Sequence, residues 1–239
     1  MNSLSVVVPT YNERKRLPKT LAGIVSYLEK LKIDSEIIIS DSASTDGTLE
    51  YVGNFKSKIP IVIVKDKVRL GKGSGVKKGI LAAKKEWVLF MDADNSTPID
   101  EVEKLMPYLD DNQVVIGSRY KGLEAERKQG VVRRAVSRLG NLFIGHITHL
   151  DFKDTQCGFK IFRHDAAHNI FSRLKTKGWG FDVEVLMLAQ QLGYRIAEVP
   201  VLWRDAAGSH LRAGRDSIET LVEVMKVARL VKNNKNDEN

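Results

Sequence analysis

Two aspartates lie one residue apart in the middle of the chain, directly after an apolar run. Asp92 and Asp94 belong to the stretch FMDADNSTP. Two carboxylates this close repel each other, and each favours protonation unless a cation lies between them. Their hard oxygen atoms suit Mg²⁺ or Mn²⁺, ions that share the rest of their coordination shell with water and phosphate. The pattern predicts a divalent metal site at the end of a buried strand, although a helix cap at Asp92 beside a solvated Asp94 also fits it.

Composition and charge narrow the classes of partner. The chain has 239 residues, of which 43% are hydrophobic and 28% are charged, as is typical of a soluble globular protein with a full core. Its formal net charge of +8 indicates anionic partners, which include nucleic acid, phospholipid and phosphorylated substrates. The single cysteine, Cys157, excludes an internal disulfide and fits a reducing compartment. Because no histidine stands beside it, we expect a packed thiol.

Membrane-spanning and export signals are not expected. No apolar run approaches the length of about 20 residues that crosses a bilayer. The first residues, Met-Asn-Ser, run straight into a strand-like segment and leave no room for a signal sequence. We therefore expect a cytoplasmic protein.

The elements that position the aspartates alternate between short apolar runs and helix-like stretches. This alternation is typical of an α/β fold with a mostly parallel central sheet flanked by helices. Strands are expected over residues 4–9, 36–40, 59–64, 87–92 and 114–117. Polar clusters follow four of them, namely PTYNE, DSASTDGT, DADNS and GSRY. Because ligands bind beyond the carboxyl ends of such strands, the sequence predicts one site at this edge of the sheet.

The second half of the chain contains amphipathic helices. The stretch GVVRRAVSRLGNLFIGHITHL, which begins at Gly130, has an apolar helical stripe and three arginines in its first half. A further helix is expected in GFDVEVLMLAQQLGYR and a strand in IAEVPVLW. We expect one domain over residues 1–211, a C-terminal amphipathic helix over 212–232 and a disordered tail over 233–239.

Other polar residues could act in the site or only support turns. Asp41 directly follows the second strand, where its carboxylate could accept hydrogen bonds from a base or a ribose, whereas Asp46-Gly47 is typical of a turn. The loop RLGKGSG could let backbone N–H groups approach an anion, but it lacks the Walker A pattern. Since no cysteine or carboxylate completes a metal site, packing or surface roles are expected for His146/His149 and His164/His168.

Eight motifs occur in a fixed order over about residues 4–211: VVVPTYNE, SDSASTDGT, GKGSGVKKGI, MDAD, GSRY, DTQCGFKIF, WGFDVEVL and EVPVLW. Together they resemble the family 2 glycosyltransferases, in the branch that transfers one hexose from a nucleotide sugar to dolichyl phosphate. DTQCGFKIF and WGFDVEVL are most similar to the dolichyl-phosphate β-glucosyltransferases, which use UDP-glucose. The sister mannose synthases use GDP-mannose. The resemblance implies a GT-A fold, in which a Rossmann-like domain binds the nucleotide sugar.

The resemblance also implies roles in binding the donor. It matches the pocket for the base and the ribose to Pro9, Tyr11, Glu13 and Asp41. It matches the segment that holds the metal and the pyrophosphate to Asp92, Ala93 and Asp94. Arg204 and His210 fall where the mannose synthases have an arginine and a lysine that contact the donor. The chain departs from that pattern at His210 and at Ser96, which replaces a glutamine that would be a third metal ligand.

On the acceptor side, the resemblance matches a phosphate site to Arg119, Arg133 and Ser137. Arg133 and Ser137 are four residues apart and therefore share a helical face. Asp94 and Arg119 are the implied catalytic residues.

A phosphate acceptor fits the chemistry that the residues offer. Sugar transfer to a hydroxyl needs a base, and no side chain stands out as one. A phosphate monoester needs none, because its second pKa of about 6 leaves it mostly dianionic at neutral pH. Arginines would hold this phosphate while a metal on Asp92 and Asp94 neutralises the departing diphosphate. We expect a metal-dependent, inverting hexosyltransferase that forms a β-linked lipid-phosphate sugar.

Three other functions stay open on this evidence. The chain could be a GDP-mannose-dependent dolichyl-phosphate mannose synthase, a family 2 transferase acting on a polysaccharide hydroxyl, or a non-catalytic protein whose basic face binds nucleic acid or anionic membrane. Nucleic acid is not expected, because the chain has no RNA-recognition motif, zinc finger or basic stretch interleaved with aromatic residues.

A lipid acceptor cannot leave the bilayer, so we expect peripheral contact with the cytoplasmic face of a membrane. The helix that begins near Gly130 and the C-terminal helix combine apolar stripes with basic residues, which suits the headgroup region. Membrane contact is favoured for the helix from Gly130, whereas for the C-terminal helix we favour packing of the stripe on the domain core. A membrane-bound partner subunit is the alternative means of docking.

Overall fold

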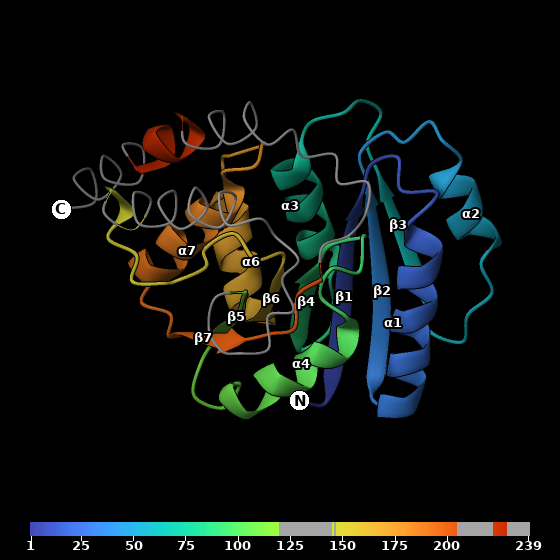
Figure 1. Ribbon diagram of the computed structural model, residues 1–239, viewed down its shortest axis with the longest axis horizontal. Coiled ribbons are helices and arrows are strands. Elements are labelled where there is room, and N and C mark those ends of the chain that lie inside the picture. The colour runs from blue at the N-terminus through green and yellow to red at the C-terminus, as the bar shows by residue number, and fades with distance from the viewer. Residues whose placement is uncertain (120–144, 146, 205–221, 229–239) are drawn as a thin grey trace.

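A seven-stranded sheet with helices on both faces makes up the computed structural model, which describes residues 1–119, 145, 147–204 and 222–228 (Figure 1). The strand order is β3-β2-β1-β4-β6-β5-β7. The strands are β1 (Ser3–Thr10), β2 (Asp34–Asp41), β3 (Ile61–Lys65), β4 (Trp87–Met91), β5 (Val114–Ser118), β6 (Phe159–Arg163) and β7 (Ile196–Pro200). The predicted α/β class is confirmed.

Six of these strands run in one direction, and β6 runs against them between β4 and β5. Parallel strands buried on both faces read as continuous apolar runs, which explains VVV in β1 and III in β2. The expected strand 59–64 begins only at Ile61. Pro60 has no N–H group and contributes its carbonyl, which accepts a hydrogen bond from the N–H of Ile37.

Two groups of helices cover the two faces of the sheet (Figure 1). One face packs against α1 (Leu17–Leu31), α2 (Thr48–Asn54) and α4 (Val102–Leu105), the last flanked by the 3-10 turns η1 (Ile99–Glu101) and η2 (Met106–Tyr108). The other face packs against α3 (Lys72–Ala82), α6 (His164–Arg173) and α7 (Phe181–Gln191). Neighbouring strand residues alternate between these cores, since Val7 faces α3 while Val6 and Val8 face α1.

The C-terminal helix is described over residues 222–228, and it packs on the same core as α6 and α7. Val224, Val227 and Ala228 are buried there, whereas Lys226 is exposed. For these residues the apolar stripe packs on the protein core, which agrees with the favoured expectation for this helix and not with membrane contact.

Several predicted features lie outside the described residues. They are the helix from Gly130 with Arg133 and Ser137, together with His146 and His210. Within the described part of the chain, no helix has both the length and the apolar character needed to cross a membrane.

Candidate active site

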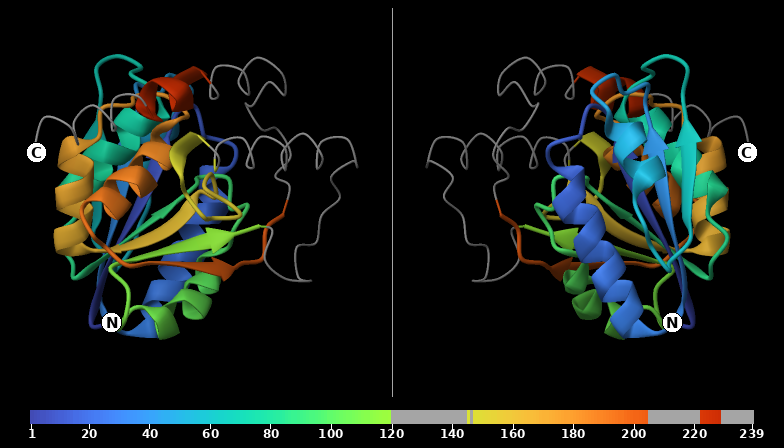
Figure 2. Two further views of the ribbon diagram at one scale, coloured as in Figure 1. Left: turned by 90° about the vertical axis from the view of Figure 1, so that its left-hand side faces the viewer. Right: turned by 90° about the vertical axis from the view of Figure 1, so that its right-hand side faces the viewer.

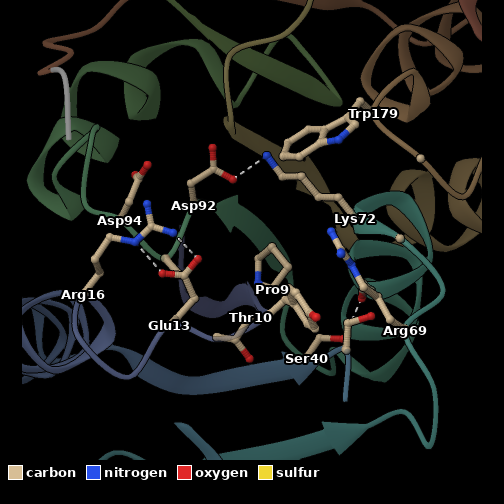
Figure 3. A pocket seen from close by; sticks show the side chains of 16 residues that line it. Pro9, Thr10, Glu13, Arg16, Ser40, Arg69, Lys72, Asp92, Asp94 and Trp179 are labelled. Carbon is tan, nitrogen blue, oxygen red and sulfur yellow. Dashed lines mark hydrogen bonds and ion pairs between the residues drawn. The ribbon is translucent and has the colours of Figure 1, made fainter. Parts of the chain in front are cut away.

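A pocket lies at the carboxyl ends of β1, β2 and β4, where the polar clusters were predicted (Figure 3). The loops after these strands form one side, and the start of α3 with the segment before α7 forms the other. Six residues with predicted roles line the pocket, namely Pro9, Tyr11, Glu13, Asp92, Ala93 and Asp94. Two more, Gly71 and Gly75, belong to the loop RLGKGSG that was expected to approach an anion. The sequence assigned no role to the side chains of the other lining residues, namely Thr10, Arg16, Ser40, Ser42, Arg69, Lys72, Gly178 and Trp179.

Lys72, the first residue of α3, reaches across the pocket to the paired aspartates (Figure 3). Its Nζ atom lies 2.7 Å from Oδ1 of Asp92 and 5.1 Å from the ring centre of Trp179. Burial lowers the pKa of Lys72, but attraction to Asp92 and Asp182 outweighs it and holds the pKa above its ordinary value. A charged ammonium group therefore stands at the centre of the pocket. In the sequence, Lys72 lies within the loop RLGKGSG, where only the glycines suggested a role in binding an anion.

The two aspartates lie in the turn after β4, and the start of β6 fixes their position. The N–H of Asp92 donates a hydrogen bond to the carbonyl of Gly158 at 3.2 Å. A Cβ atom on Gly158 would lie 2.1 Å from Oδ2 of Asp92, so only glycine leaves room for this carboxylate. Oδ1 of Asp94 accepts a hydrogen bond from the N–H of Ser96 at 2.9 Å. The turn thus presents both carboxylates at one edge of the pocket.

These carboxylates fit a divalent cation that takes only part of its coordination shell from the protein. Among the residues that the structure describes, no group of three or more His, Cys, Asp or Glu side chains could hold a metal ion. Mg²⁺ and Mn²⁺ accept sites with one or two carboxylates, because substrate phosphates and water supply the other ligands. The ion pair of Asp92 with Lys72 shows that this edge of the pocket already holds positive charge.

The pocket also offers a flat surface and a fixed carboxylate, on different sides (Figure 3). The guanidinium carbon of Arg69, on the side of Lys72, lies 4.1 Å from the ring centre of Tyr11. Arg16, on the side of Asp94, donates two hydrogen bonds to Glu13, from Nε to Oε2 at 2.6 Å and from Nη2 to Oε1 at 2.5 Å. The stacked planar groups suit a nucleobase, and the fixed carboxylate suits a hydroxyl group.

Asp41 lies behind the pocket wall instead of lining it. Its side chain is buried, and Oδ1 accepts a hydrogen bond from Oγ1 of Thr10 at 2.8 Å. Oδ2 accepts another from the N–H of Ser44 at 2.9 Å. The structure therefore brings Asp41 near the predicted base and ribose site, with Thr10 between its carboxylate and the pocket.

Arg119, at the end of β5, is held by a carboxylate that had no assigned role. Its Nε and Nη2 atoms donate to Oδ2 and Oδ1 of Asp154 at 2.7 and 2.8 Å, and its backbone N–H donates to Oδ2 at 2.9 Å. Burial raises the pKa of Asp154, but the guanidinium outweighs it and holds the pKa below its ordinary value. Arg119 also lies over the ring of Trp203, 5.8 Å from its centre. It does not line the pocket of Asp92 and Asp94.

The segment after β7 contacts the loop that carries the aspartates. The backbone N–H of Arg204 donates a hydrogen bond to the carbonyl of Ser96 at 2.8 Å, and the Arg204 side chain is exposed. Arg204 thus lies beside the loop that carries Asp92 and Asp94. His210, Arg133 and Ser137 cannot be placed, since they lie outside the described residues.

Cys157, Asp46 and the pair His164/His168 have the structural roles that the sequence predicted for them. Cys157 is buried, which raises the pKa of its thiol to about 12, so the packed thiol is confirmed. Asp46 accepts hydrogen bonds from the backbone N–H groups of Arg14 and Thr48, and so supports a turn. The rings of His164 and His168 pack against each other with centres 4.3 Å apart.

Comparison with known sequences decides the family. The sequence model of glycosyl transferase family 2 matches residues 5–171. The chain belongs to this family. The transferase is 36% identical over 239 residues to the dolichyl-phosphate beta-glucosyltransferase of Dictyostelium discoideum, a match that covers 94% of this chain and 73% of the relative. It is 38% identical over 232 residues to the human dolichyl-phosphate beta-glucosyltransferase, covering 87% of this chain and 69% of the relative.

Solved structures share the fold of the transferase. One is glucosyl-3-phosphoglycerate synthase from Mycobacterium tuberculosis in complex with Mn²⁺, UDP-glucose and phosphoglyceric acid, with a TM-score of 0.70 and 20% identity over 95% of this chain and 80% of that one. Another is mannosyl-3-phosphoglycerate synthase from Rubrobacter xylanophilus, with a TM-score of 0.72 and 17% identity over 98% and 75%. The expected GT-A fold is confirmed.

Proposed function

We propose that this family 2 transferase moves glucose from UDP-glucose to dolichyl phosphate or a similar polyprenyl phosphate, and that it forms a β-linked lipid-phosphate glucose. One observation carries the proposal. Dolichyl-phosphate beta-glucosyltransferases from a slime mould, yeast and human match the chain at 36%, 35% and 38% identity over 94%, 90% and 87% of its length. The pocket agrees with this reaction, because it combines a metal-ligand pair with cations suited to a diphosphate.

The donor lies in the pocket at the carboxyl ends of β1, β2 and β4. The base and the ribose contact Pro9, Tyr11 and Glu13, which line the pocket, and Asp41 supports this contact through Thr10. The diphosphate lies near Ala93 and the ammonium group of Lys72. Arg204 and His210 are the further donor contacts proposed from the family pattern.

A divalent cation, Mg²⁺ or Mn²⁺, is held by Asp92 and Asp94. When bound, the cation neutralises the negative charge that develops on the departing nucleotide diphosphate. Lys72 adds a second positive charge on the same side, because its ammonium contacts Asp92. The ion pair holds the ammonium group in place before substrate arrives, and such a preorganised charge stabilises a developing anion effectively.

The acceptor phosphate is held by Arg119, together with Arg133 and Ser137. The bond to Asp154 fixes the Arg119 guanidinium, so little orientation is lost when an anion binds. The dianionic phosphate attacks the sugar carbon directly and expels UDP, which inverts the configuration at that carbon. No protein base takes a proton in this step.

The transferase works at the cytoplasmic face of a membrane as a peripheral protein. Four of the six exposed large apolar side chains in the described residues gather on β3 and the loop after it: Val62, Ile63, Val68 and Leu70. Exposed basic residues interleave with them, namely Lys65, Lys67 and Arg69. β3 is one of the two edge strands of the sheet and lies toward the viewer in the right-hand view of Figure 2. Apolar side chains between basic ones suit an anionic lipid surface, with about 1 kcal/mol gained per basic residue. A membrane-bound partner subunit would be a second means of docking.

The deciding experiment is a transfer assay with purified protein. UDP-glucose and GDP-mannose are each incubated with a short, soluble polyprenyl phosphate, with and without Mn²⁺ or Mg²⁺, and the lipid product is analysed. We expect glucosyl-phosphate lipid from UDP-glucose with metal only. Transfer from GDP-mannose at an equal or higher rate would overturn the donor, and transfer to a glycan hydroxyl without any lipid phosphate would overturn the acceptor.

A further inference from the structure

The loop before α7 carries Trp179 into the pocket, and a carboxylate from the far end of the chain holds this loop. Trp179 lies between Gly178 and Gly180, and its ring lies beside Lys72 on the same side of the pocket (Figure 3). The backbone N–H of Gly180 donates a hydrogen bond to Oε2 of Glu223 at 2.7 Å. Glu223 lies on the C-terminal helix, 43 residues further along the chain.

The fit between Glu223 and the loop depends on glycine. A Cβ atom on Gly178 would lie 2.1 Å from Oε1 of Glu223, and one on Gly180 would lie 2.9 Å from Cβ of Glu223. The carboxylate therefore rests directly on the backbone on both sides of Trp179. Any side chain at position 178 would displace it.

Both ends of this contact are fixed by packing. Val224, Val227 and Ala228 anchor the C-terminal helix in the core that it shares with α6 and α7, so the backbone at Glu223 is tied to that core. On the other side, the N–H of Ser74 in α3 donates a hydrogen bond to the carbonyl of Lys177 at 3.3 Å. The loop thus lies between the C-terminal helix and the turn of α3 that carries Lys72.

Trp179 in turn shapes the surroundings of the pocket lysine. Its ring centre lies 5.1 Å from Nζ of Lys72, the atom that pairs with Asp92. An aromatic ring at this distance attracts the ammonium group and shields it from water. A shift of the loop would change both the wall of the pocket and the place of this positive charge.

We propose that Glu223 is a positioning residue for donor binding, which it supports by holding the Gly178–Gly180 loop so that Trp179 and Lys72 face the nucleotide diphosphate. This proposal rests on the proposed donor site, but it concerns affinity for UDP itself. The C-terminal helix is accordingly part of the donor site, although none of its described residues lines the pocket.

The test measures UDP binding by calorimetry in three variants of the full chain, with Mn²⁺ present. Glu223→Ala loses the hydrogen bond to Gly180. We expect UDP affinity to fall about tenfold, which is the effect expected when one charge-assisted hydrogen bond is lost. Glu223→Gln keeps an oxygen acceptor and should recover most of the affinity. Lys226→Ala, at an exposed position on the same helix, is the matched control and should bind UDP as wild type does.

A spectroscopic readout separates positioning from general stability. The fluorescence change of Trp179 on UDP binding, obtained by subtracting the signal of Trp179→Phe, should shrink in Glu223→Ala and return in Glu223→Gln. Gly178→Ala should produce the same defect, because its methyl group displaces the carboxylate. The double variant Gly178→Ala/Glu223→Ala should be no worse than either single variant, since both remove one contact.

Two results would overturn the proposal. One is wild-type UDP affinity and fluorescence in Glu223→Ala, even with a lower melting temperature, since Glu223 would then only stabilise the fold. The other is full additivity of Gly178→Ala and Glu223→Ala in UDP affinity. Failure of wild type to glucosylate a lipid phosphate would contradict the proposed function instead, and would leave these UDP measurements interpretable.

Discussion

Lys72 and Asp92 join the two sides of the pocket through an ion pair, with Nζ of Lys72 2.7 Å from Oδ1 of Asp92. The lysine comes from the start of α3 and the aspartate from the end of β4, so the pair brings together two elements at the carboxyl edge of the sheet. A metal ion on Asp92 would add a second positive charge beside the ammonium group. The site is therefore built to collect negative charge from a bound ligand.

Activity should require a divalent cation that Asp94 helps to hold. Excess chelator should abolish glucosyl transfer, and Mn²⁺ or Mg²⁺ should restore it. Asp94→Asn should lower kcat about 100-fold or more, because the metal loses a charged ligand. The melting temperature should stay unchanged, since asparagine can still accept the hydrogen bond from Ser96. Full turnover by wild type in excess chelator would contradict the metal assignment.

Removing the charge of Lys72 should weaken the donor site more than the acceptor site. We expect Lys72→Met to lower UDP affinity about tenfold and to leave the KM for lipid phosphate nearly unchanged, because the ammonium faces Asp92 and the proposed diphosphate position. Calorimetry with UDP and initial-rate kinetics measure the two effects. Lys78→Met, on the same helix and paired with Asp66, is the control. Equal losses in both variants would point to the net charge of α3 instead.

Arg119 should contribute to stability as well as to acceptor binding. Asp154 is fully buried, so Arg119→Ala leaves an unpaired carboxylate inside the protein and should lower the free energy of unfolding by about 3 to 5 kcal/mol. Arg119→Ala/Asp154→Asn should recover most of this stability in urea unfolding. Because it still lacks the guanidinium, the double variant should show a raised KM for lipid phosphate with normal UDP affinity. Normal acceptor kinetics in this stable double variant would remove Arg119 from the acceptor site.

The same pair predicts how stability responds to acid. The pKa of Asp154 in the folded protein lies below its ordinary value of 3.8, because Arg119 outweighs the effect of burial. Such a group stabilises the fold above its unfolded pKa, and this contribution is lost as the pH falls through the folded pKa. Urea unfolding between pH 7 and pH 3 should therefore show a smaller acid loss in Asp154→Asn than in wild type.

A second acidic residue provides the control for this acid experiment. Asp165 also pairs with an arginine, Arg163, and its pKa is also lowered, but its side chain is 60% exposed. Exposed ion pairs contribute little to stability. Asp165→Asn should therefore lose stability in acid as wild type does. If both variants lose less stability in acid than wild type does, a special role for the buried pair is contradicted.

Membrane contact should depend on the loop after β3. Val68 is 61% exposed, and Val68→Asp should reduce flotation with anionic liposomes at low salt without changing the melting temperature. Tyr108→Asp, at an exposed apolar site in η2, should float as wild type does. If wild type does not float at any salt concentration, docking requires a partner subunit.

The sheet and the pocket edge were predictable because their signals are local. Apolar runs such as VVV and III mark strands buried on both faces, and polar clusters after them mark one edge. The antiparallel β6 was not predicted, because its stretch FKIFR has charged residues at its second and last positions. Lys160 is nevertheless buried, and it donates hydrogen bonds to Asp182 and to the carbonyl of Cys157. These partners come close to Lys160 only in the folded protein, so the sequence alone predicts an exposed lysine.

The site shows the same limit. Asp92 and Asp94 could be predicted from their spacing, whereas Lys72 could not, because its contact with Asp92 depends on how α3 packs against the sheet. The contact of Asp154 with Arg119 could not be predicted for a similar reason, because the two residues lie 35 positions apart along the chain. For Asp41, the sequence predicted the position at the end of a strand. It did not predict that the side chain is buried behind Thr10.

The bond between Arg119 and Asp154 also bears on how such an enzyme can vary in length. Arg119 directly follows β5 and Asp154 precedes β6, and three hydrogen bonds join these two residues, which lie 35 residues apart along the chain. The entropy of closing a loop rises only slowly with its length. Relatives should therefore tolerate changes of length between Arg119 and Ile147 at little cost in stability, whereas Leu150 has to be kept because it belongs to the core.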